Sequence, residues 1–264
     1  MRARTHGTPR RITHRNALPR TDPLNALAVI PARHAAQRFP GKPLATLWGK
    51  PMLQHVWERA CRVEGLDHVI VATDDARIEH AARAWGATVE MTSPECASGT
   101  DRVAEVAQRH PEAQIVLNLQ GDEPELDSAG VSRLLAGMRA EPDVRMATLA
   151  HRATDVSKFS SDHVVKLGLD AGGFAIYFTR QWPPAAGEGR EILRHIGVYG
   201  FTREFLLEFA GWPPGRAERA ERLEQLRAVE RGVKIRVYMS DHLAQGIDTP
   251  EQLAELEARG PQRQ

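Results

Sequence analysis

Cations are concentrated in one short stretch near the start of the chain. Arg33, Arg38 and Lys42 lie within ten residues, in the run PARHAAQRFPGKP at 31–43. Guanidinium groups fork onto phosphate oxygens, and a lysine ammonium adds a compact point charge. The stretch therefore fits a polyphosphate ligand, with a solvated basic loop as the alternative. Its glycine spacing matches neither the P-loop nor the GxGxxG dinucleotide turn.

An acidic motif comes later in the chain. Asp122 lies in Gln-Gly-Asp-Glu-Pro, directly after the apolar run QIVLNL at 114–119. Beside a polyphosphate this acid would hold Mg²⁺, a hard ion that takes one or two carboxylates together with phosphate oxygens. Glu123 is the rival ligand, and a helix N-cap or turn is the simpler explanation of either acid. Asp248, in GIDTP, also follows a strand-like segment, and an N-cap explains it well.

Nucleophilic catalysis and zinc binding find little support in the sequence. Cys61 lies on the apolar face of an expected helix, and Cys96 has no histidine and acid tied to it by spacing. His195 lies inside a strand-like run, where a buried, hydrogen-bonded histidine is commoner than a catalytic one. The histidines and cysteines show no zinc-ligand spacing.

Apolar runs alternate with helical patterns in the first half of the chain. We expect strands at 26–30, 68–72, 88–91 and 114–119, and helices at 51–62, 76–85 and 98–110. This order predicts an α/β fold with a mainly parallel sheet and helices on both faces. Ligands of such sheets bind beyond the carboxyl ends of the strands, which is where the basic loop and Asp122 fall.

The rhythm changes after Asp143. Strand-like runs at 146–151, 164–169, 174–178 and 195–201 predict a smaller antiparallel part, inserted in or attached to the main sheet. We expect a charged helix at 217–231, a strand at 233–237 and a closing helix at 249–259. The pattern favours a single domain over residues 25–260, with the smaller layer at about 151–212.

Charge separates the head of the chain from its body. The chain has 35 basic and 34 acidic residues, and residues 1–24 hold six of the arginines and one acid. The remaining 29 basic and 33 acidic residues give residues 25–264 a net charge of −4. A mildly acidic body with 6% aromatic residues argues against nucleic acid as a partner.

Residues 1–24 are expected to be a disordered basic tail. A transit peptide, a phosphate- or membrane-binding arm and an upstream start codon are the alternatives.

Membrane and secreted classes do not fit the sequence. No apolar run approaches the roughly 18 residues of a membrane span, and no apolar core follows the basic head as it would in a secretory signal. The chain has two cysteines, which fit a reducing cytosol. We therefore expect a cytoplasmic protein with no membrane partner.

A set of motifs runs in order along essentially all of residues 26–256. The motifs are PARHAAQRFPGKPL (31–44), GKPM (49–52), VIVATDD (69–75), SGTDR (98–102), NLQGDEP (118–124), MATL (146–149), VVKLGLD (164–170), AIYFTR (175–180), LRHIGVYGF (193–201), LEQLR (223–227) and GIDTPEQL (246–253). Together they resemble the 3-deoxy-manno-octulosonate (KDO) cytidylyltransferases, also called CMP-KDO synthetases. The resemblance implies a Rossmann-like nucleotidyltransferase fold and a homodimer.

The resemblance also implies a reaction and a set of site residues. CMP passes from CTP to the anomeric hydroxyl of KDO for lipopolysaccharide assembly, and pyrophosphate is released. Lys42, Asp122 and Asp248 match catalytic positions, the two aspartates as ligands of Mg²⁺. The implied nucleotide-binding residues are Arg33, Arg38, Lys42, Ser98, Gly99, Arg102 and Gln120. The implied sugar-binding residues are Gln120, Arg180, His195, Tyr199, Glu224 and Gln225, with Arg180 on the sugar carboxylate.

The chain departs from the family's pattern at a few positions. Ala36 stands where a small hydroxyl residue is usual, so one phosphate or ribose hydrogen bond is in question. Cys96 and Ala97 stand in a loop that is often more polar, which affects the expected base contacts. The segment at 181–191 is shorter than in many members.

Three other functions stay open at this point. An enzyme for 8-amino-3,8-dideoxy-manno-octulosonate (8-amino-KDO) has similar loops. A sugar-nucleotide-binding module without turnover is a second alternative, against which the intact Lys42, Asp122 and Asp248 argue. A glycosyltransferase of related fold would want an Asp-x-Asp motif where this chain has Gln-Gly-Asp.

Overall fold

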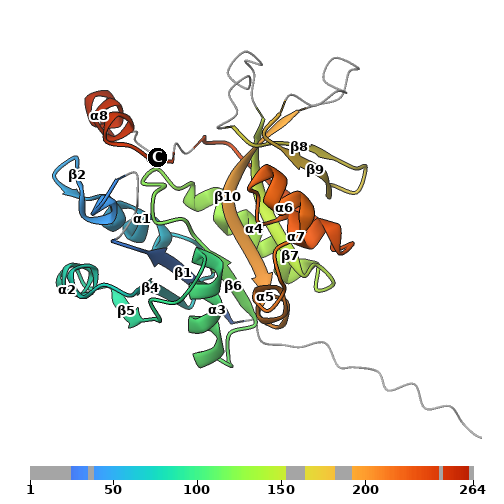
Figure 1. Ribbon diagram of the computed structural model, residues 1–264, viewed down its shortest axis with the longest axis horizontal. Coiled ribbons are helices and arrows are strands. Elements are labelled where there is room, and N and C mark those ends of the chain that lie inside the picture. The colour runs from blue at the N-terminus through green and yellow to red at the C-terminus, as the bar shows by residue number, and fades with distance from the viewer. Residues whose placement is uncertain (1–24, 35–38, 153–163, 182–191, 244–245, 262–264) are drawn as a thin grey trace, which may run out of the picture.

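The computed structural model describes residues 25–34, 39–152, 164–181, 192–243 and 246–261. Within them, one nine-stranded sheet has helices on both faces (Figure 1). Its strands are β1 (Ala26–Ala32), β4 (His68–Thr73), β5 (Thr88–Met91), β6 (Ile115–Asn118), β7 (Met146–Arg152), β8 (Lys166–Leu169), β9 (Ala175–Thr179), β10 (Leu193–Thr202) and β11 (Ile235–Ser240). A separate pair is formed by β2 (Thr46–Leu47) and β3 (Lys50–Pro51), after a 3-10 turn at Lys42–Leu44.

Helices fill most of the connections between these strands. They are α1 (Met52–Ala60), α2 (Ala76–Ala84), α3 (Gly99–Arg109), α4 (Ser128–Ala140), α5 (Arg203–Ala210), α6 (Arg216–Glu221), α7 (Leu226–Glu230) and α8 (Pro250–Arg259). None of the helices in the described part of the chain is long and apolar enough to cross a bilayer.

The strand order shows how the parallel and antiparallel parts join. The main path runs β11-β7-β10-β6-β1-β4-β5, with β1 parallel to both β4 and β6. β10 is antiparallel to its neighbours β6 and β7, and the β8–β9 pair is attached through β10. This confirms the predicted α/β fold with a mainly parallel sheet and a smaller antiparallel part. β7 and β10, expected in the smaller part, lie within the main sheet.

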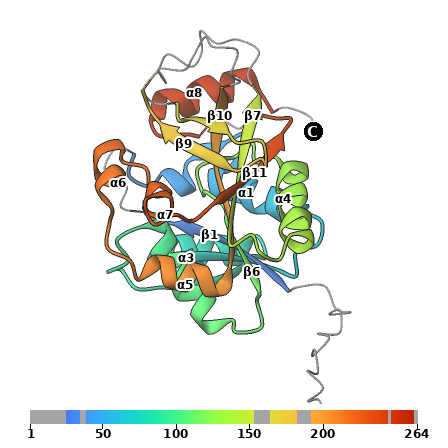
Figure 2. The same cartoon turned by 90° about the vertical axis from the view of Figure 1, so that its right-hand side faces the viewer.

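The alternation of side chains along each strand divides the core between the two faces. Along β1, Ala28 and Ile30 pack with α1, α2 and α4, whereas Leu27 and Val29 pack with α3, α5 and α7. Figure 2 shows α4 and the α5–α7 group on opposite sides of β7, β10 and β11. Continuous apolar runs such as ALAVI are therefore required, because both faces are covered.

One predicted helix is wrong and two helices were not anticipated. The charged helix expected at 217–231 is two short helices, α6 and α7, because Arg222 adopts a left-handed conformation with φ of 55°. A left-handed residue cannot continue a right-handed helix. Helices α4 and α5 lie in segments for which no helix was expected.

The first strand, expected at 26–30, continues past Pro31 to Ala32. Pairing of β1 with β6 stops at Val29 and Asn118, while pairing with β4 continues to Ala32. The missing N–H of Pro31 therefore removes no bond from the ladder with β6. Gly121 packs against this point, where a Cβ atom would lie 2.9 Å from the carbonyl oxygen of Pro31. A glycine is required there, and it brings the loop after β6 close to the end of β1.

Candidate active site

The carboxyl ends of β1, β4 and β6 meet at one edge of the sheet. After β1, the next strands of the sheet, β4 and β5, lie on one side of β1, whereas β6 lies on its other side. The strand order therefore reverses between β1 and β6. Ligands of open α/β sheets bind at such a reversal. The basic loop follows β1 at this edge, and Asp122 follows β6.

Lys42 joins two aspartates that are far apart in the sequence. Its Nζ atom lies 2.7 Å from Oδ2 of Asp122 and 3.4 Å from Oδ1 of Asp248, and it donates to the carbonyl oxygen of Ile247 at 2.8 Å. The backbone N–H of Ile247 donates to the carbonyl oxygen of Asp122. The loop before α8 is thereby held against the loop after β6, and both carboxylates face one cation.

The same two carboxylates are suited to a hard divalent ion. Asp122 and Asp248 supply oxygen donors that converge on one position, which the Lys42 ammonium contacts. Their side chains are 33% and 46% exposed, so water and phosphate oxygens have access. Mg²⁺ is bound in this way, by one or two carboxylates with the remaining ligands from water and substrate. The described residues contain no group of three or more His, Cys, Asp and Glu side chains arranged for a metal. The two aspartates therefore fit Mg²⁺ rather than a closed, all-protein metal site.

The basic loop is closed by backbone hydrogen bonds. The N–H of Gly41 donates to the carbonyl oxygen of His34 at 2.9 Å, and Gly41 has a φ of 75°, which favours glycine. This turn directs Lys42 toward the aspartates. Arg33 donates through Nη2 to the carbonyl oxygen of Cys96 at 2.7 Å. The third predicted cation, Arg38, lies outside the described residues.

The amino terminus of α3 contributes the segment predicted to lie near the nucleotide. Ser98 is the N-cap and accepts the N–H of Asp101, while the Asp101 carboxylate accepts the N–H of Ser98. This capping box fixes the start of the helix. Gly99 and the buried Thr100 then form its first turn. Thr100 is bonded through its hydroxyl to Glu224, so the predicted nucleotide and sugar sides are in direct contact.

Arg102 is placed differently from the other predicted nucleotide ligands. Its side chain is fully buried, and its guanidinium group contacts Asp74 at 3.0 Å and the hydroxyl of Thr92. Asp74 follows β4 and Thr92 follows β5. In this arrangement Arg102 links the residues that follow two neighbouring strands. Its side chain would have to move out of its buried position to contact a ligand directly.

A chain of hydrogen bonds crosses the floor of the site. The Thr100 hydroxyl donates to Glu224, Asn118 Nδ2 donates to Thr100 Oγ1 at 3.2 Å, and Gln120 Nε2 donates to Asn118 Oδ1 at 3.3 Å. Burial raises the pKa of Glu224 in spite of the opposing hydrogen bond from Thr100. With its Nε2 directed at Asn118, Gln120 keeps its side-chain oxygen as an acceptor for a ligand.

His195, Tyr199 and Arg180 form a wall beside this floor, because Tyr199 on β10 is the register partner of Asn118 on β6. The rings of His195 and Tyr199 lie 5.4 Å apart on β10, and the ring of Phe178 contacts His195 edge-on at 5.3 Å. Burial, together with the positive charge of Arg180, lowers the pKa of His195 to about 3. Burial and the Glu224 carboxylate raise the pKa of Tyr199 well above its ordinary value. His195 and Tyr199 are therefore neutral side chains beside the cation of Arg180.

Three buried polar groups near the site have an atom without a hydrogen-bond partner in the described part of the chain, the first being Arg102 at its Nε atom. Gln225 is 3% exposed and its Nε2 atom is unpartnered, as is one carboxylate oxygen of Glu123. Burial, with the neighbouring charge of Asp122, raises the pKa of Glu123 to about 8. Buried polar groups are normally satisfied, so unpartnered ones beside the candidate site are consistent with a site that a ligand completes.

Comparison with known proteins identifies the family. A family model described as cytidylyltransferase matches residues 27–235. The 3-deoxy-manno-octulosonate cytidylyltransferase of Geobacter sulfurreducens is 46% identical, over 88% of this chain and 98% of the relative. The chain belongs to the 3-deoxy-manno-octulosonate cytidylyltransferase family.

Two further matches bear on the nucleotide and the sugar. A solved structure of a CMP:2-keto-3-deoxy-manno-octonic acid synthetase complexed with CTP superposes with a TM-score of 0.84 at 42% identity, over 89% of this chain and 98% of that one. The 8-amino-3,8-dideoxy-manno-octulosonate cytidylyltransferase of Shewanella sp. (strain ANA-3) is 41% identical over 89% of this chain and 98% of the relative. The family thus includes relatives named for two different sugars.

Several residues of this cytidylyltransferase site were not anticipated from the sequence. They are Asp74, Thr92, Thr100, Asn118, Thr148 and Glu221. Each is a polar residue that bonds a predicted site residue, and for all of them except Asn118 that partner comes from another element. Most fall inside the motifs quoted above, so polar residues within those motifs were the available signal. Their partners depend on which strands are neighbours, and that information is absent from any one motif.

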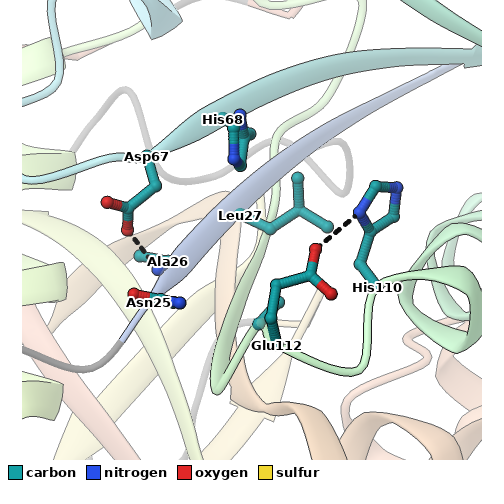
Figure 3. Close-up of a pocket in the computed structure, with 8 residues that line it drawn as sticks. Asn25, Ala26, Leu27, Asp67, His68, His110 and Glu112 are labelled. Atoms are coloured by element: carbon teal, nitrogen blue, oxygen red, sulfur yellow. Dashed lines mark hydrogen bonds and ion pairs between the residues drawn. The ribbon is translucent and has the colours of Figure 1, made fainter.

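A small pocket elsewhere in the cytidylyltransferase fold holds other titratable groups. It is lined by Asp67, His68, His110 and Glu112, with Asn25 and Leu27 beside them (Figure 3). These residues lie at the amino ends of β1 and β4 and just before β6, at the edge of the sheet opposite the candidate site. The pocket is therefore separate from the predicted chemistry.

Proposed function

We propose that this chain transfers CMP from CTP to the anomeric hydroxyl of KDO. The anomeric hydroxyl gives up its proton to solvent as its oxygen forms a bond to the α-phosphorus, the bond from that phosphorus to the bridging oxygen breaks, and pyrophosphate leaves. The convergence of Lys42, Asp122 and Asp248 on one position, beside a cationic loop at the strand ends, carries the proposal. The family membership and the likeness to a CTP-complexed relative support it.

The triphosphate side of the site is assigned to the basic loop and the two aspartates. Arg33 and Lys42 would contact phosphate oxygens, as would Arg38. Asp122 and Asp248 would hold Mg²⁺, which when bound polarises the α-phosphate and neutralises charge. Lys42 would then share the aspartates with the ion and present its ammonium to the leaving phosphates. Ser98, Gly99 and Gln120 would line the ribose and base, with Arg102 behind them.

The sugar side is assigned to the wall and floor already described. Arg180 would bind the carboxylate of the sugar acid, because its guanidinium lies next to two neutral rings and donates through Nε to the backbone carbonyl oxygen of Glu221. The Glu221 carboxylate accepts the backbone N–H of Arg180 and fixes the chain at this point. His195, Tyr199, Gln120 and Glu224 would meet hydroxyl groups. Gln225, with its unpartnered amide, would complete the site. The reacting groups are then positioned rather than covalently activated, which is the main source of rate in such transfers.

A homodimer in the cytoplasm is the further part of this proposal. β9 pairs only with β8 among the described strands and carries Ile176, which is 49% exposed. Exposed apolar side chains on edge strands favour association. A second copy covering this edge would remove Ile176 from water.

Transfer to 8-amino-KDO is the alternative, favoured by the similarity to a relative named for that sugar. An ammonium group would need an acceptor where KDO has a hydroxyl, and Glu224 offers a carboxylate within the site.

A pyrophosphate-release assay with CTP and Mg²⁺ tests these proposals together. KDO should give turnover and UTP should replace CTP poorly. A strong preference for 8-amino-KDO would replace KDO in the proposal. No release with either sugar, while CTP still binds, would favour a binding module instead.

A further inference from the structure

Thr148 is a polar residue in an apolar part of the sheet. It lies in the middle of β7 and is fully buried. The neighbouring strand β10 has an irregularity in register between Ile196 and Tyr199, where it faces Thr148. Such a bulge leaves backbone carbonyls without their regular ladder partners. The Thr148 hydroxyl meets them, at 2.7 Å from the carbonyl oxygen of Val198 and 3.3 Å from that of Ile196.

The same hydroxyl oxygen contacts a nitrogen of His195. Thr148 Oγ1 lies 2.9 Å from Nε2 of His195. A hydroxyl has one proton, and a carbonyl oxygen can only accept. The short contact to Val198 therefore requires that proton, because two oxygens at 2.7 Å without a hydrogen between them would repel. Thr148 Oγ1 is left as an acceptor toward His195, so Nε2 must carry a hydrogen.

This arrangement selects one tautomer of the ring. A neutral imidazole has one N–H and one lone pair, so hydrogen on Nε2 leaves the lone pair on Nδ1. The ring is neutral at all ordinary pH values because burial and the charge of Arg180 lower the pKa of His195 to about 3. Its plane is held from the side by the edge-on contact with Phe178.

We propose that Thr148 is a positioning residue which holds His195 as the Nε2–H tautomer, so that Nδ1 accepts a hydrogen bond from a donor group of the sugar substrate. The inference rests on the proposed function for the identity of that substrate. The tautomer of His195 is independent of the proposed function, because it follows from contacts within the protein. A hydroxyl or ammonium donor of the sugar fits Nδ1, and a bare acceptor does not.

The first test compares steady-state constants of three variants. Thr148→Val keeps the shape of the side chain and removes the hydroxyl, whereas Thr148→Ser keeps the hydroxyl. Thr202→Val is the matched control. Thr202 lies on β10 and caps α5 through its own hydroxyl, so its loss also costs one hydrogen bond. We expect Thr148→Val to raise the KM for KDO about fivefold to tenfold, the effect of one lost hydrogen bond. The KM for CTP should stay unchanged, and Thr148→Ser should behave as the parent protein.

The second test reads the tautomer directly in the protein without substrate. Nitrogen NMR of histidine-labelled protein distinguishes protonated from unprotonated ring nitrogens, and His195→Asn assigns the signal. We expect Nε2 protonated and Nδ1 unprotonated in the parent protein and in Thr202→Val, and a mixture of tautomers in Thr148→Val. Asparagine keeps a polar group at the position of Nδ1 without contact to Thr148. Adding Thr148→Val to His195→Asn should therefore change the KM for KDO little further.

Each outcome bears on the inference separately from the function. A proton on Nδ1 in the parent protein would overturn the inference, as would equal KM values for KDO in Thr148→Val and Thr202→Val. If neither sugar supports pyrophosphate release, the proposed function fails, and the NMR measurement still decides whether Thr148 sets the tautomer.

Discussion

Among single residues, Lys42 is in the most consequential position. Its ammonium contacts Asp122 and Asp248, and its side chain is only 13% exposed. The basic loop predicted from the sequence was expected to bind phosphate, and the structure adds that its lysine also organises the acids. A cation shared by two carboxylates can turn toward phosphate when a divalent ion takes over the carboxylates.

Replacing Asp122 tests the acid side of this arrangement. We expect Asp122→Asn to reduce kcat by at least about a hundredfold, the scale of losing one preorganised charge in the transition state. CTP binding should be partly retained, because the lost interaction matters more in the transition state than in the ground state. Pyrophosphate release and calorimetric CTP titration measure the two effects. Asp143→Asn, an exposed acid before β7, serves as the control. A kcat like that of the parent protein in Asp122→Asn would refute the metal role.

Replacing Lys42 tests the basic side. Lys42→Ala should lower kcat/KM for CTP by roughly tenfold or more, since a charge-assisted hydrogen bond to a phosphate is lost. Lys50→Ala is a matched control, because Lys50 lies nearby on β3 and pairs with Glu58 on the surface. Rates measured over a range of CTP concentrations give kcat/KM for both variants and show whether only Lys42→Ala is impaired. An unchanged kcat/KM for CTP in Lys42→Ala would remove the residue from the site.

At the scale of elements, the regular segments were predictable and the irregular ones were not. Periodicity predicted β5 at its observed bounds, and α3 within one residue at each end, because both are simple amphipathic segments. The helix expected at 217–231 failed at Arg222, whose left-handed backbone no periodic pattern reveals. That break matters for function, because Glu224 and Gln225 lie between α6 and α7. The β10 bulge beside Thr148 was equally invisible, since register depends on the neighbouring strand.

The contact between the end of α3 and the edge strand β5 is expected to depend on pH. His110 lies between the carboxylates of Glu90 and Glu112, the second contact being visible in Figure 3. Burial alone would lower the pKa of His110, but the hydrogen bonds to Glu90 and Glu112 outweigh it and raise the pKa. Arg109, which also contacts Glu90, and His68 near Glu112 are the other charged or titratable groups facing it.

The sign of the effect follows from the raised pKa. The folded protein holds the His110 proton more tightly than the unfolded chain does, so this stabilisation is fully present below about pH 6.5, the ordinary pKa. It is lost as pH rises through the higher folded pKa. Urea midpoints of the parent protein and His110→Gln should therefore differ most at pH 5.5 and converge toward pH 8.5. His80→Gln, at an exposed position on α2, is the control. A difference that grows with rising pH would contradict the assignment.

At the scale of the whole molecule, the question is what covers β9, which among the described strands pairs only with β8. The main path of the sheet ends at β5 and β11, and β9 is the outer strand of the pair attached through β10. The sequence predicted a homodimer only through the family resemblance, because an interface between two copies produces no periodic pattern of apolar residues in the sequence of one copy. The structure supplies a candidate contact, the exposed Ile176 on β9.

We expect light scattering to give the mass of a dimer for the parent protein and of a monomer for Ile176→Glu. A buried carboxylate without a partner opposes association strongly, since its desolvation is not compensated. Met91→Glu is the matched control. Met91 is 40% exposed on β5, at the other end of the sheet, so the same change there should leave the dimer intact. If Ile176→Glu stays a dimer, the β9 edge is not the interface. If both variants become monomers, the interface is not confined to one edge.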